Sequence, residues 1–209
     1  SLNKKEIKKE YEECLLQQSG PFPNINVIWD CGNGATGEIV SSLIKKLPGQ
    51  HKVLFNEIDG NFPNHHPDPT IEKNLVHLKN EMKKENADLG ISFDGDGDRI
   101  GIISAEGNLI PGDLLTAFLS GSILNKKKNQ EIIFDIKSSQ TALNIVRKQN
   151  GRPIISKTGH SLIKTKLKET NSPLAGEMSG HIFFNDNWFG FDDAIYAALR
   201  FLQEILTRN

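Results

Sequence analysis

The stretch 87–104 constrains this chain more than any other part of it. An apolar, β-prone run leads into the loop 94–99, which has the sequence Asp-Gly-Asp-Gly-Asp-Arg, and a second apolar run leaves it. Apolar runs of this length and composition predict two buried strands. Gly95 and Gly97 lack Cβ atoms, so the loop can curl until its alternate carboxylates converge. The stretch therefore predicts a strand–loop–strand unit that presents three aspartates at one end of a sheet.

Asp94, Asp96 and Asp98 are predicted to bind a metal ion. Three carboxylates within five residues repel one another unless a cation lies among them. Hard oxygen ligands in this number suit Mg²⁺, which also takes phosphate oxygens and waters. A calcium EF-hand is excluded, because its sixth position is Arg99 instead of glycine, its twelfth is Ala105 instead of glutamate, and its flanks are predicted strands. A solvated acidic turn is the alternative, and the buried flanks favour the metal site.

The composition limits the class of protein. The 209 residues leave room for one large domain or two ordinary ones, and 37% apolar residues are usual for a globular core. A net charge of −1 gives no electrostatic case for nucleic acid or an anionic membrane as partner. Cys14 and Cys31 show no pairing pattern, which is typical of the reducing cytoplasm. The chain has no signal peptide and no apolar run long enough to cross a bilayer.

Predicted helices and strands alternate along the chain. The first half is predicted to contain helices at 4–18, 36–46 (with Thr36 as cap) and 71–85, and strands at 25–30, 52–58, 87–93 and 99–104. The second half is predicted to contain helices at 112–124, 139–149, 159–169 and 191–206, and strands at 131–136, 152–156, 173–176 and 181–185. This order favours two consecutive α/β domains, 1–107 and 108–209, with mixed, mostly parallel sheets flanked by helices.

The segment 176–181, with the sequence Gly-Glu-Met-Ser-Gly-His, is a second candidate site. Glu177, Ser179 and His181 alternate, so in an extended segment they would point to the same side. A carboxylate accepts from two neighbouring hydroxyls, and the serine and histidine each add a donor or an acceptor. This set suits a sugar, and a polar turn without a ligand is the alternative.

Two further loops follow predicted strands of the second half. Lys157-Thr-Gly-His160 begins a helix, whose free amides favour an anion, and Lys137 follows the strand 131–136. Each signal is weak alone. In open α/β sheets, however, ligands bind at the carboxyl ends of the strands, where these two loops and the segment 176–181 are all expected.

Two other motifs are interpreted as structural. The turn 30–34, Asp-Cys-Gly-Asn-Gly, lacks both the G-x-G-x-x-G spacing and the lysine of a P-loop. Its Cys31 is expected to be an inert core thiol. His65 and His66 stand among three prolines and are expected to pack a rigid loop.

Four motifs together resemble the α-D-phosphohexomutases, and specifically their bacterial phosphomannomutase/phosphoglucomutase branch. They are Phe-Pro-Asn-His-His-Pro-Asp-Pro at 62–69, the acidic loop 94–99, Lys-Thr-Gly-His at 157–160 and Gly-Glu-Met-Ser-Gly-His at 176–181. The resemblance covers essentially the whole chain. Members of this family have four domains around a central cleft, and this chain resembles the second and third. The start at Ser1, inside a helical pattern, also suggests a piece of a longer protein.

The resemblance implies an isomerase. A phosphoserine in the first domain gives its phosphoryl group to a hexose monophosphate, the bisphosphate reorients, and its other phosphate returns to the serine. Glucose 1,6-bisphosphate or a similar compound acts as activator. The resemblance implies Mg²⁺ ligands at Asp94, Asp96 and Asp98, catalytic support from Arg99, and substrate contacts at Glu177, Ser179, Gly180, His181, Lys137, Thr158, Gly159 and His160.

The departures from the family matter as well. No Ser-His-Asn-Pro segment, which carries the phosphoserine, is present, and neither is the phosphate clamp of the fourth domain. The expected partners are therefore a phosphosugar and the missing first and fourth domains. The chain alone is expected to lack mutase activity and to bind Mg²⁺ weakly.

Two alternatives stay open from the sequence. One is a phosphatase of the haloacid-dehalogenase type with Asp94 as nucleophile, although its Gly-Asp-x-x-x-Asp segment is lacking, since Gly112-Asp113 is followed by Ala117. The other is a non-catalytic metal- or sugar-binding module. The sequence also leaves open the preference for mannose or glucose phosphate.

Overall fold

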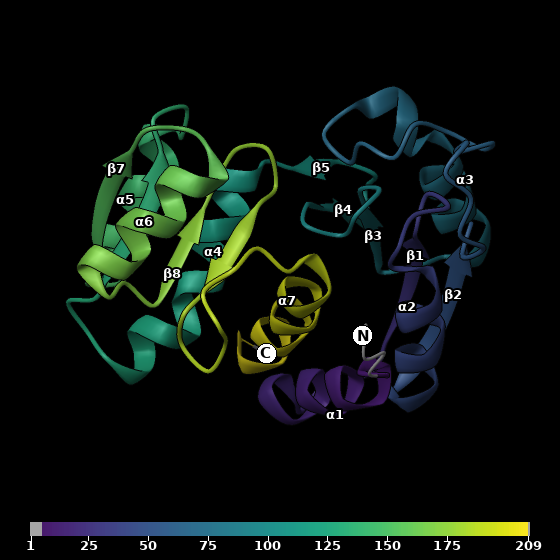
Figure 1. Ribbon diagram of the computed structural model, residues 1–209, viewed down its shortest axis with the longest axis horizontal. Helices are drawn as coiled ribbons and strands as arrows, with labels where there is room; N and C mark the ends of the chain where they lie inside the picture. The colour runs from purple at the N-terminus through teal and green to yellow at the C-terminus, as the bar shows by residue number, and fades with distance from the viewer. Residues whose placement is uncertain (1–5, 209) are drawn as a thin grey trace, which may run out of the picture.

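The computed structural model describes residues 6–208 and contains two mixed sheets flanked by helices (Figure 1). The first half contains α1 (Lys8–Ser19), β1 (Ile25–Asp30), α2 (Gly37–Leu43), the 3₁₀ segment η1 (Ile44–Lys46), β2 (Gly49–Leu54), the 3₁₀ segment η2 (Glu72–Leu75), α3 (Val76–Glu85), β3 (Leu89–Phe93), β4 (Ile100–Ser104) and β5 (Leu109–Ile110). The second half contains α4 (Gly112–Lys126), β6 (Glu131–Asp135), α5 (Gln140–Lys148), β7 (Arg152–Ser156), α6 (His160–Thr170), β8 (Leu174–Gly176), β9 (Ile182–Phe184) and α7 (Ala194–Arg208). The predicted fold class is confirmed.

Both sheets combine parallel and antiparallel pairing. The first has the order β2-β1-β3-β4-β5, in which β1 is parallel to β2 and β3, while β4 and β5 pair antiparallel. The second has the order β7-β6-β8-β9, with β6 parallel to its two neighbours and β9 antiparallel to β8. Parallel strands end at one edge of their sheet, so the loops after β6, β7 and β8 share an edge, as predicted.

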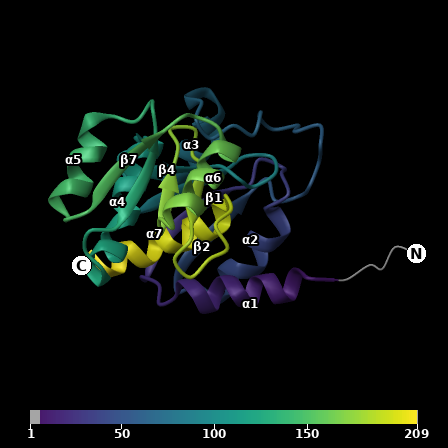
Figure 2. The ribbon, with the colours of Figure 1, turned by 60° about the vertical axis from the view of Figure 1, so that its left-hand side comes forward.

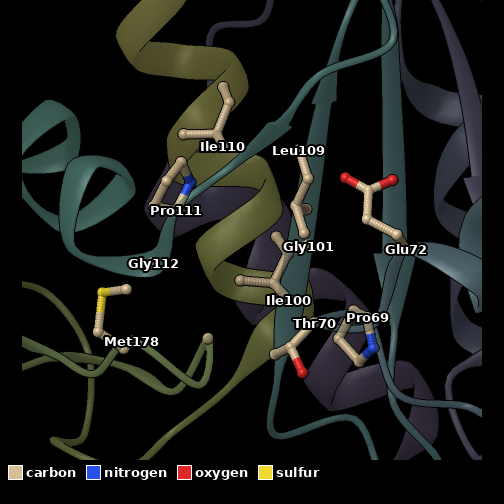
Figure 3. Close-up of a pocket in the computed structure, with 11 residues that line it drawn as sticks. Pro69, Thr70, Glu72, Ile100, Gly101, Leu109, Ile110, Pro111, Gly112 and Met178 are labelled. Carbon is tan, nitrogen blue, oxygen red and sulfur yellow. The ribbon is translucent and has the colours of Figure 1, made fainter. Parts of the chain in front are cut away.

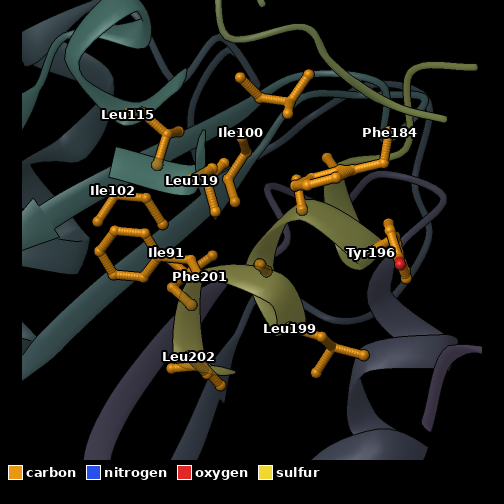
Figure 4. Close-up of a cluster of buried hydrophobic side chains, with 14 of the residues drawn as sticks. Ile91, Ile100, Ile102, Leu115, Leu119, Phe184, Tyr196, Leu199, Phe201 and Leu202 are labelled. Atoms are coloured by element: carbon orange, nitrogen blue, oxygen red, sulfur yellow. The ribbon is translucent and has the colours of Figure 1, made fainter. Parts of the chain in front are cut away.

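A shared hydrophobic core joins the two halves. Its main cluster includes side chains of β3, β4, α4, β9 and α7. Figure 4 labels Ile91, Ile100, Ile102, Leu115, Leu119, Phe184, Tyr196, Leu199, Phe201 and Leu202 among those around α7. The opposite face of each sheet has a smaller cluster of its own, with α3 in the first half and α6 in the second. Helix α7 therefore lies between the two sheets, and α1 packs beside it (Figures 1 and 2). This shared burial fixes the position of one half against the other.

Several predicted boundaries were wrong. The second strand covers 49–54 instead of 52–58, because its register follows β1 and Phe55 takes a left-handed φ of 52° that ends the extension. The last helix begins at Ala194 instead of residue 191. Its first turn starts after Asp193, whose carboxylate accepts the backbone N–H of Tyr196. The predicted helix 71–85 is the segment η2 followed by α3.

Thr36 precedes α2, but its side chain makes no hydrogen bond that caps the helix. The predicted Thr36 cap was therefore also wrong. Its own backbone is already helical (φ −73°, ψ −20°), whereas a capping residue normally has extended angles. Among residues 6–208, no helix has both the length and the apolar character that a membrane span requires.

Candidate functional site

The loop 94–99, called the metal loop below, curls around its own first carboxylate. Asp94 is 1% exposed, and its Oδ1 accepts the backbone N–H groups of Gly97, Asp98 and Arg99 at 3.0, 3.1 and 3.1 Å. Its Oδ2 accepts from Arg99 Nε at 2.7 Å. Burial opposes ionisation, but Arg99 and the backbone donors hold the pKa of Asp94 below its ordinary value. The loop is therefore organised around a charged aspartate.

The metal loop has the donor chemistry of a cation site. One carboxylate oxygen from each of Asp94, Asp96 and Asp98 lies within 4.8 Å of the others. Burial raises the pKa of Asp98 to about 6, and repulsion from the neighbouring Asp94 carboxylate adds to that shift. A divalent cation would relieve this repulsion, and a set made only of oxygens fits Mg²⁺.

Two neighbouring segments support the metal loop. The backbone N–H of Ala35, directly after the turn 30–34 (called the glycine turn below), donates to the carbonyl of Gly95 at 2.9 Å. Phe62 and Pro67 also pack against Gly95, where an added Cβ would meet their side chains at 3.2 and 3.4 Å. The glycine turn thus has a structural role, as interpreted from the sequence. Cys31 within it is fully buried, and burial raises the pKa of its thiol to about 12.

The proline loop, residues 62–69, reaches Arg99. Its His65 directs Nε2 at the Asp30 carboxylate, 3.0 Å from each oxygen, and Nδ1 at the His66 carbonyl, 3.0 Å away. Both ring nitrogens face acceptors, which fits a protonated imidazole. Asp68 lies with its Oδ2 3.3 Å from Arg99 Nη1, so the guanidinium is held between Asp68 and Asp94. Asp68 lies within the motif 62–69 but was not predicted as a site residue.

The segment 176–181, called the sugar loop below, is a turn and not an extended segment. The Glu177 N–H donates to the His181 carbonyl, and the Gly180 N–H donates to the Glu177 carbonyl. The alternation argument was therefore wrong in its geometry. The side chains converge all the same, because Glu177 Oε2 and Ser179 Oγ lie 3.1 and 2.9 Å from His181 Nδ1.

Glu177 is charged and tightly held. It is 1% exposed, and its Oε1 accepts the Gly159 N–H at 2.7 Å. Burial works against ionisation, yet His181 and the Gly159 N–H lower the pKa of Glu177. Burial likewise opposes protonation of His181, but Glu177 and Asp98 raise its pKa. Glu177 and His181 thus form a close acid–histidine pair at the centre of the sugar loop, with the second ring nitrogen of His181 toward Asp98.

The other predicted sugar contacts are only partly gathered here. His160 begins α6, and its ring centroid lies 6.2 Å from that of His181. Thr158 donates to Asp135 Oδ2 at 3.4 Å, at the end of β6. Lys137 is exposed on the loop after β6, and within residues 6–208 no hydrogen bond or ion pair ties it to the sugar loop.

The metal loop and the sugar loop meet directly. Arg99 and His181 form a β-bridge, and the Ile100 N–H donates to the Gly180 carbonyl at 3.1 Å. His181 Nε2 lies 3.4 Å from Asp98 Oδ1. The two candidate sites, which come from different halves of the chain, therefore form one site. Asp192 also belongs to it, since its carboxylate groups with Asp98 and His181 within 4.8 Å, and the sequence argument did not find it.

Two cavities of about 250 Å³ border this junction. The first lies between the proline loop, β4, β5 and the sugar loop, and Figure 3 shows Pro69, Ile100, Leu109 and Met178 among its walls. It is mostly apolar and contains none of the predicted ligand-binding acids. The second borders the metal loop and is lined by Asp96, Asp98, Asp192, Asp193, Tyr11 and others. The predicted metal ligands Asp96 and Asp98 therefore lie at the second cavity.

Comparison with known families matches nearly the whole chain. The family model described as "Phosphoglucomutase/phosphomannomutase, alpha/beta/alpha domain II" matches residues 7–107, and the corresponding domain III model matches residues 111–209. Both halves are thus covered by consecutive domains of one family.

Individual relatives agree. A phosphomannomutase/phosphoglucomutase from Pseudomonas aeruginosa is 49% identical over 185 residues, 88% of this chain and 40% of that protein. A phosphoglucomutase from Neisseria gonorrhoeae is 41% identical over 209 residues, 100% of this chain and 45% of that protein. A solved phosphoglucomutase/phosphomannomutase family protein from Burkholderia thailandensis has a TM-score of 0.92 and 41% identity, and covers 97% of this chain and 44% of that one. The chain spans less than half the length of these relatives.

Proposed function

Because this chain belongs to the phosphoglucomutase/phosphomannomutase family, we propose that it provides the metal- and sugar-binding part of a phosphohexomutase. The complete enzyme would interconvert hexose 1-phosphate and hexose 6-phosphate through a phosphoserine and a bisphosphorylated sugar. The chain would supply the second and third of four domains, 1–107 and 108–209. Strand β5 lies just past that boundary and still pairs with β4 of the first sheet.

The meeting of the metal loop and the sugar loop supports this proposal most strongly. Phosphoryl transfer needs a cation near the migrating phosphate and a binding set that orients the acceptor hydroxyl. The aspartate triad offers the first, and Glu177, Ser179 and His181 offer the second. The 3.4 Å approach of His181 to Asp98 puts these two requirements side by side.

The residues divide the work as follows. Asp94, Asp96 and Asp98 would hold Mg²⁺, which would neutralise negative charge on the phosphoryl group. Arg99, fixed by two carboxylates, would direct its remaining N–H groups at phosphate oxygens. The remaining proposed contacts to sugar hydroxyls or phosphate are Glu177, Ser179, Gly180, His181, Lys137, Thr158, Gly159 and His160.

The phosphatase alternative is poorly supported by the geometry of Asp94. A nucleophilic aspartate needs a free oxygen facing the substrate. Here Oδ1 accepts three backbone N–H groups and Oδ2 accepts from Arg99. Oδ1 is filled and Oδ2 already faces Arg99, so a role in holding the loop suits Asp94 better than nucleophilic attack, and Oδ2 would be the oxygen it shares with a cation.

The test is an activity comparison. The chain is produced alone and, separately, joined to the flanking domains of a close relative, and both are assayed with glucose 1-phosphate, mannose 1-phosphate, Mg²⁺ and glucose 1,6-bisphosphate. We expect 6-phosphosugar from the joined protein, none from the chain alone, and loss of activity in Asp98→Asn of the joined protein. Release of inorganic phosphate together with a trapped phospho-Asp94 would overturn the proposal in favour of a phosphatase.

A further inference from the structure

An ion pair behind the sugar loop connects two elements that carry site groups. Lys164 Nζ lies 2.6 Å from Asp192 Oδ1, and the two side chains are 32% and 7% exposed. Lys164 is on α6, one turn after His160, whereas Asp192 precedes α7. The pair therefore ties α6 to the segment 191–193, called the α7 entry below.

Helix α6 carries sugar-binding groups at its first turn. The Gly159 N–H donates to Glu177 Oε1 at 2.7 Å, and the His160 ring lies beside that of His181. Further along the helix, Lys164 Nζ lies 5.8 Å from the centroid of Phe183, whose ring neighbours His181 at 6.3 Å. A shift of α6 would therefore move the donor to Glu177 and change the stacking of His181.

The α7 entry is attached to the metal loop and to the second sheet. The backbone N–H of Ala194, directly after it, donates to the carbonyl of Gly97 at 3.1 Å. Asp192 itself bridges to Phe183 of β9 through the backbone. The α7 entry thus has a fixed place relative to the metal loop, and whatever binds it is placed with respect to that loop.

Lys164 forms an ion pair with the Asp192 carboxylate, which also lies in one group with Asp98 and His181 within 4.8 Å. Oδ2 of Asp192 is buried and accepts no hydrogen bond from residues 6–208, so Oδ1 and Lys164 carry the interaction. Asp192 is nearly buried, so removal of Lys164 leaves its charge uncompensated, and removal of Asp192 frees Lys164 toward solvent; in both cases the surrounding structure moves. Loss of either residue should therefore loosen the link between α6 and the α7 entry.

We propose, on the basis of the function proposed above, that Lys164 and Asp192 are positioning residues whose ion pair holds the sugar-binding end of α6 at a fixed place against the metal loop. Neither residue belongs to a motif from which a site was predicted. The role differs from ligand binding, because the ammonium and the carboxylate act through Gly159, His160 and Glu177.

The first test needs no ligand and uses amide hydrogen exchange at Gly159. Lys164→Met and Asp192→Asn should each speed its exchange by about tenfold or more, because the N–H bond to Glu177 opens more often. Lys164→Arg, which keeps the charge, should stay near the original rate. The matched control is Lys168→Met, an exposed lysine one turn further along α6. Exchange within about twofold of the original chain in both Lys164→Met and Asp192→Asn would overturn the proposal.

The second test separates positioning from direct ligand binding and uses glucose 1-phosphate as the probe. Positioning predicts that Lys164→Met and Asp192→Asn weaken its binding alike, by about five- to tenfold. If Lys164 contacted phosphate itself, Asp192→Asn would free it for that contact. Binding that is weaker in Lys164→Met but unchanged or tighter in Asp192→Asn would therefore overturn the proposal. If the original chain binds no sugar phosphate even when joined to flanking domains, the proposed function fails, and the exchange result still decides the ion-pair proposal.

Discussion

The two halves of the molecule share one sheet plan and differ in what they place on it. Strands β2-β1-β3-β4 of the first sheet correspond in order and direction to β7-β6-β8-β9 of the second. In each half the critical loop joins the last parallel strand to the antiparallel one, which makes the metal loop and the sugar loop topological equivalents. The plan of the sheet thus fixes where a site can form, and the side chains of the loop decide which chemistry it has.

The two loops also differ in how they are held. The metal loop is held mainly by its own residues, since Asp94 accepts three N–H groups from its own loop and Arg99 closes it, while the segment after the glycine turn and the proline loop add contacts from outside. The sugar loop depends on distant elements: Glu177 relies on the Gly159 N–H of α6, and Gly180 packs against Ile100 of the other half. A self-contained loop should tolerate changes elsewhere, whereas a dependent loop should not.

The largest effect expected is that of Asp94→Asn. An amide facing Arg99 leaves that guanidinium without its buried charged partner, so the free energy of unfolding should fall by about 3 kcal/mol. Glu177→Gln, the equivalent change in the sugar loop, should cost less, because His181 is easily neutralised. Urea denaturation measures both, and a greater loss in Glu177→Gln would reverse our ranking of the two loops.

Gly180→Ala tests the joint between the loops. Gly180 has a φ of 94°, and a Cβ there would lie 2.6 Å from the carbonyl oxygen of Ile100. We expect a loss of about 2 kcal/mol, because the backbone strains and the loops separate. Gly60→Ala is the matched control, since a Cβ at Gly60 meets nothing within 4 Å. Equal stability of the two variants in thermal or urea unfolding would show that the loops are not tightly joined.

Mg²⁺ should stabilise the chain modestly. With free Mg²⁺ at ten times its dissociation constant, the free energy of unfolding should rise by about 1.4 kcal/mol. The gain should vanish in Asp98→Asn, and Glu106→Gln, an exposed carboxylate outside the site, should keep it. A gain that persists in Asp98→Asn would place the cation elsewhere.

The sequence predicted the metal loop better than the sugar loop, because the metal loop is held mostly by residues close to it in the chain. The spacing of Asp94, Asp96 and Asp98 between apolar runs contains most of the logic of the metal loop, because the hydrogen-bond donors to Asp94 lie within five residues of it. The position of the sugar loop could be predicted but its conformation could not. Glu177 is held by the Gly159 N–H, and the turn of the sugar loop packs against Ile100. Contacts between residues far apart in the chain leave no local periodicity.

The same limit explains the wrong boundaries and the missed residues. Strand β2 takes its ends from its register with β1 and not from its own composition. Asp68 and Asp192 matter through Arg99 and Lys164, which only the fold brings to them. The overall alternation of helices and strands was predictable, because burial on one face of each element imposes a pattern on the sequence itself.

The smallest effect expected is a pH dependence that contrasts two histidines of the first half. The hydrogen bond to Asp30 raises the pKa of His65, whereas burial lowers the pKa of His51. A raised pKa means that the His65 contribution is complete below about pH 6.5 and is lost as pH rises through the folded value. The lowered pKa of His51 means the reverse, a contribution present above about pH 6.5 and lost as pH falls.

Unfolding curves from pH 5 to pH 9 measure both contributions as differences from the original chain. The stability lost in His65→Gln should shrink as pH rises, and the stability lost in His51→Gln should grow, each by about 1 kcal/mol or less. If His65→Gln were equally destabilised at both ends of the range, folding would leave the pKa of His65 unchanged. The proline loop would then be held to β1 by packing and ordinary hydrogen bonds, and its support of Arg99 and the metal loop would not depend on charge.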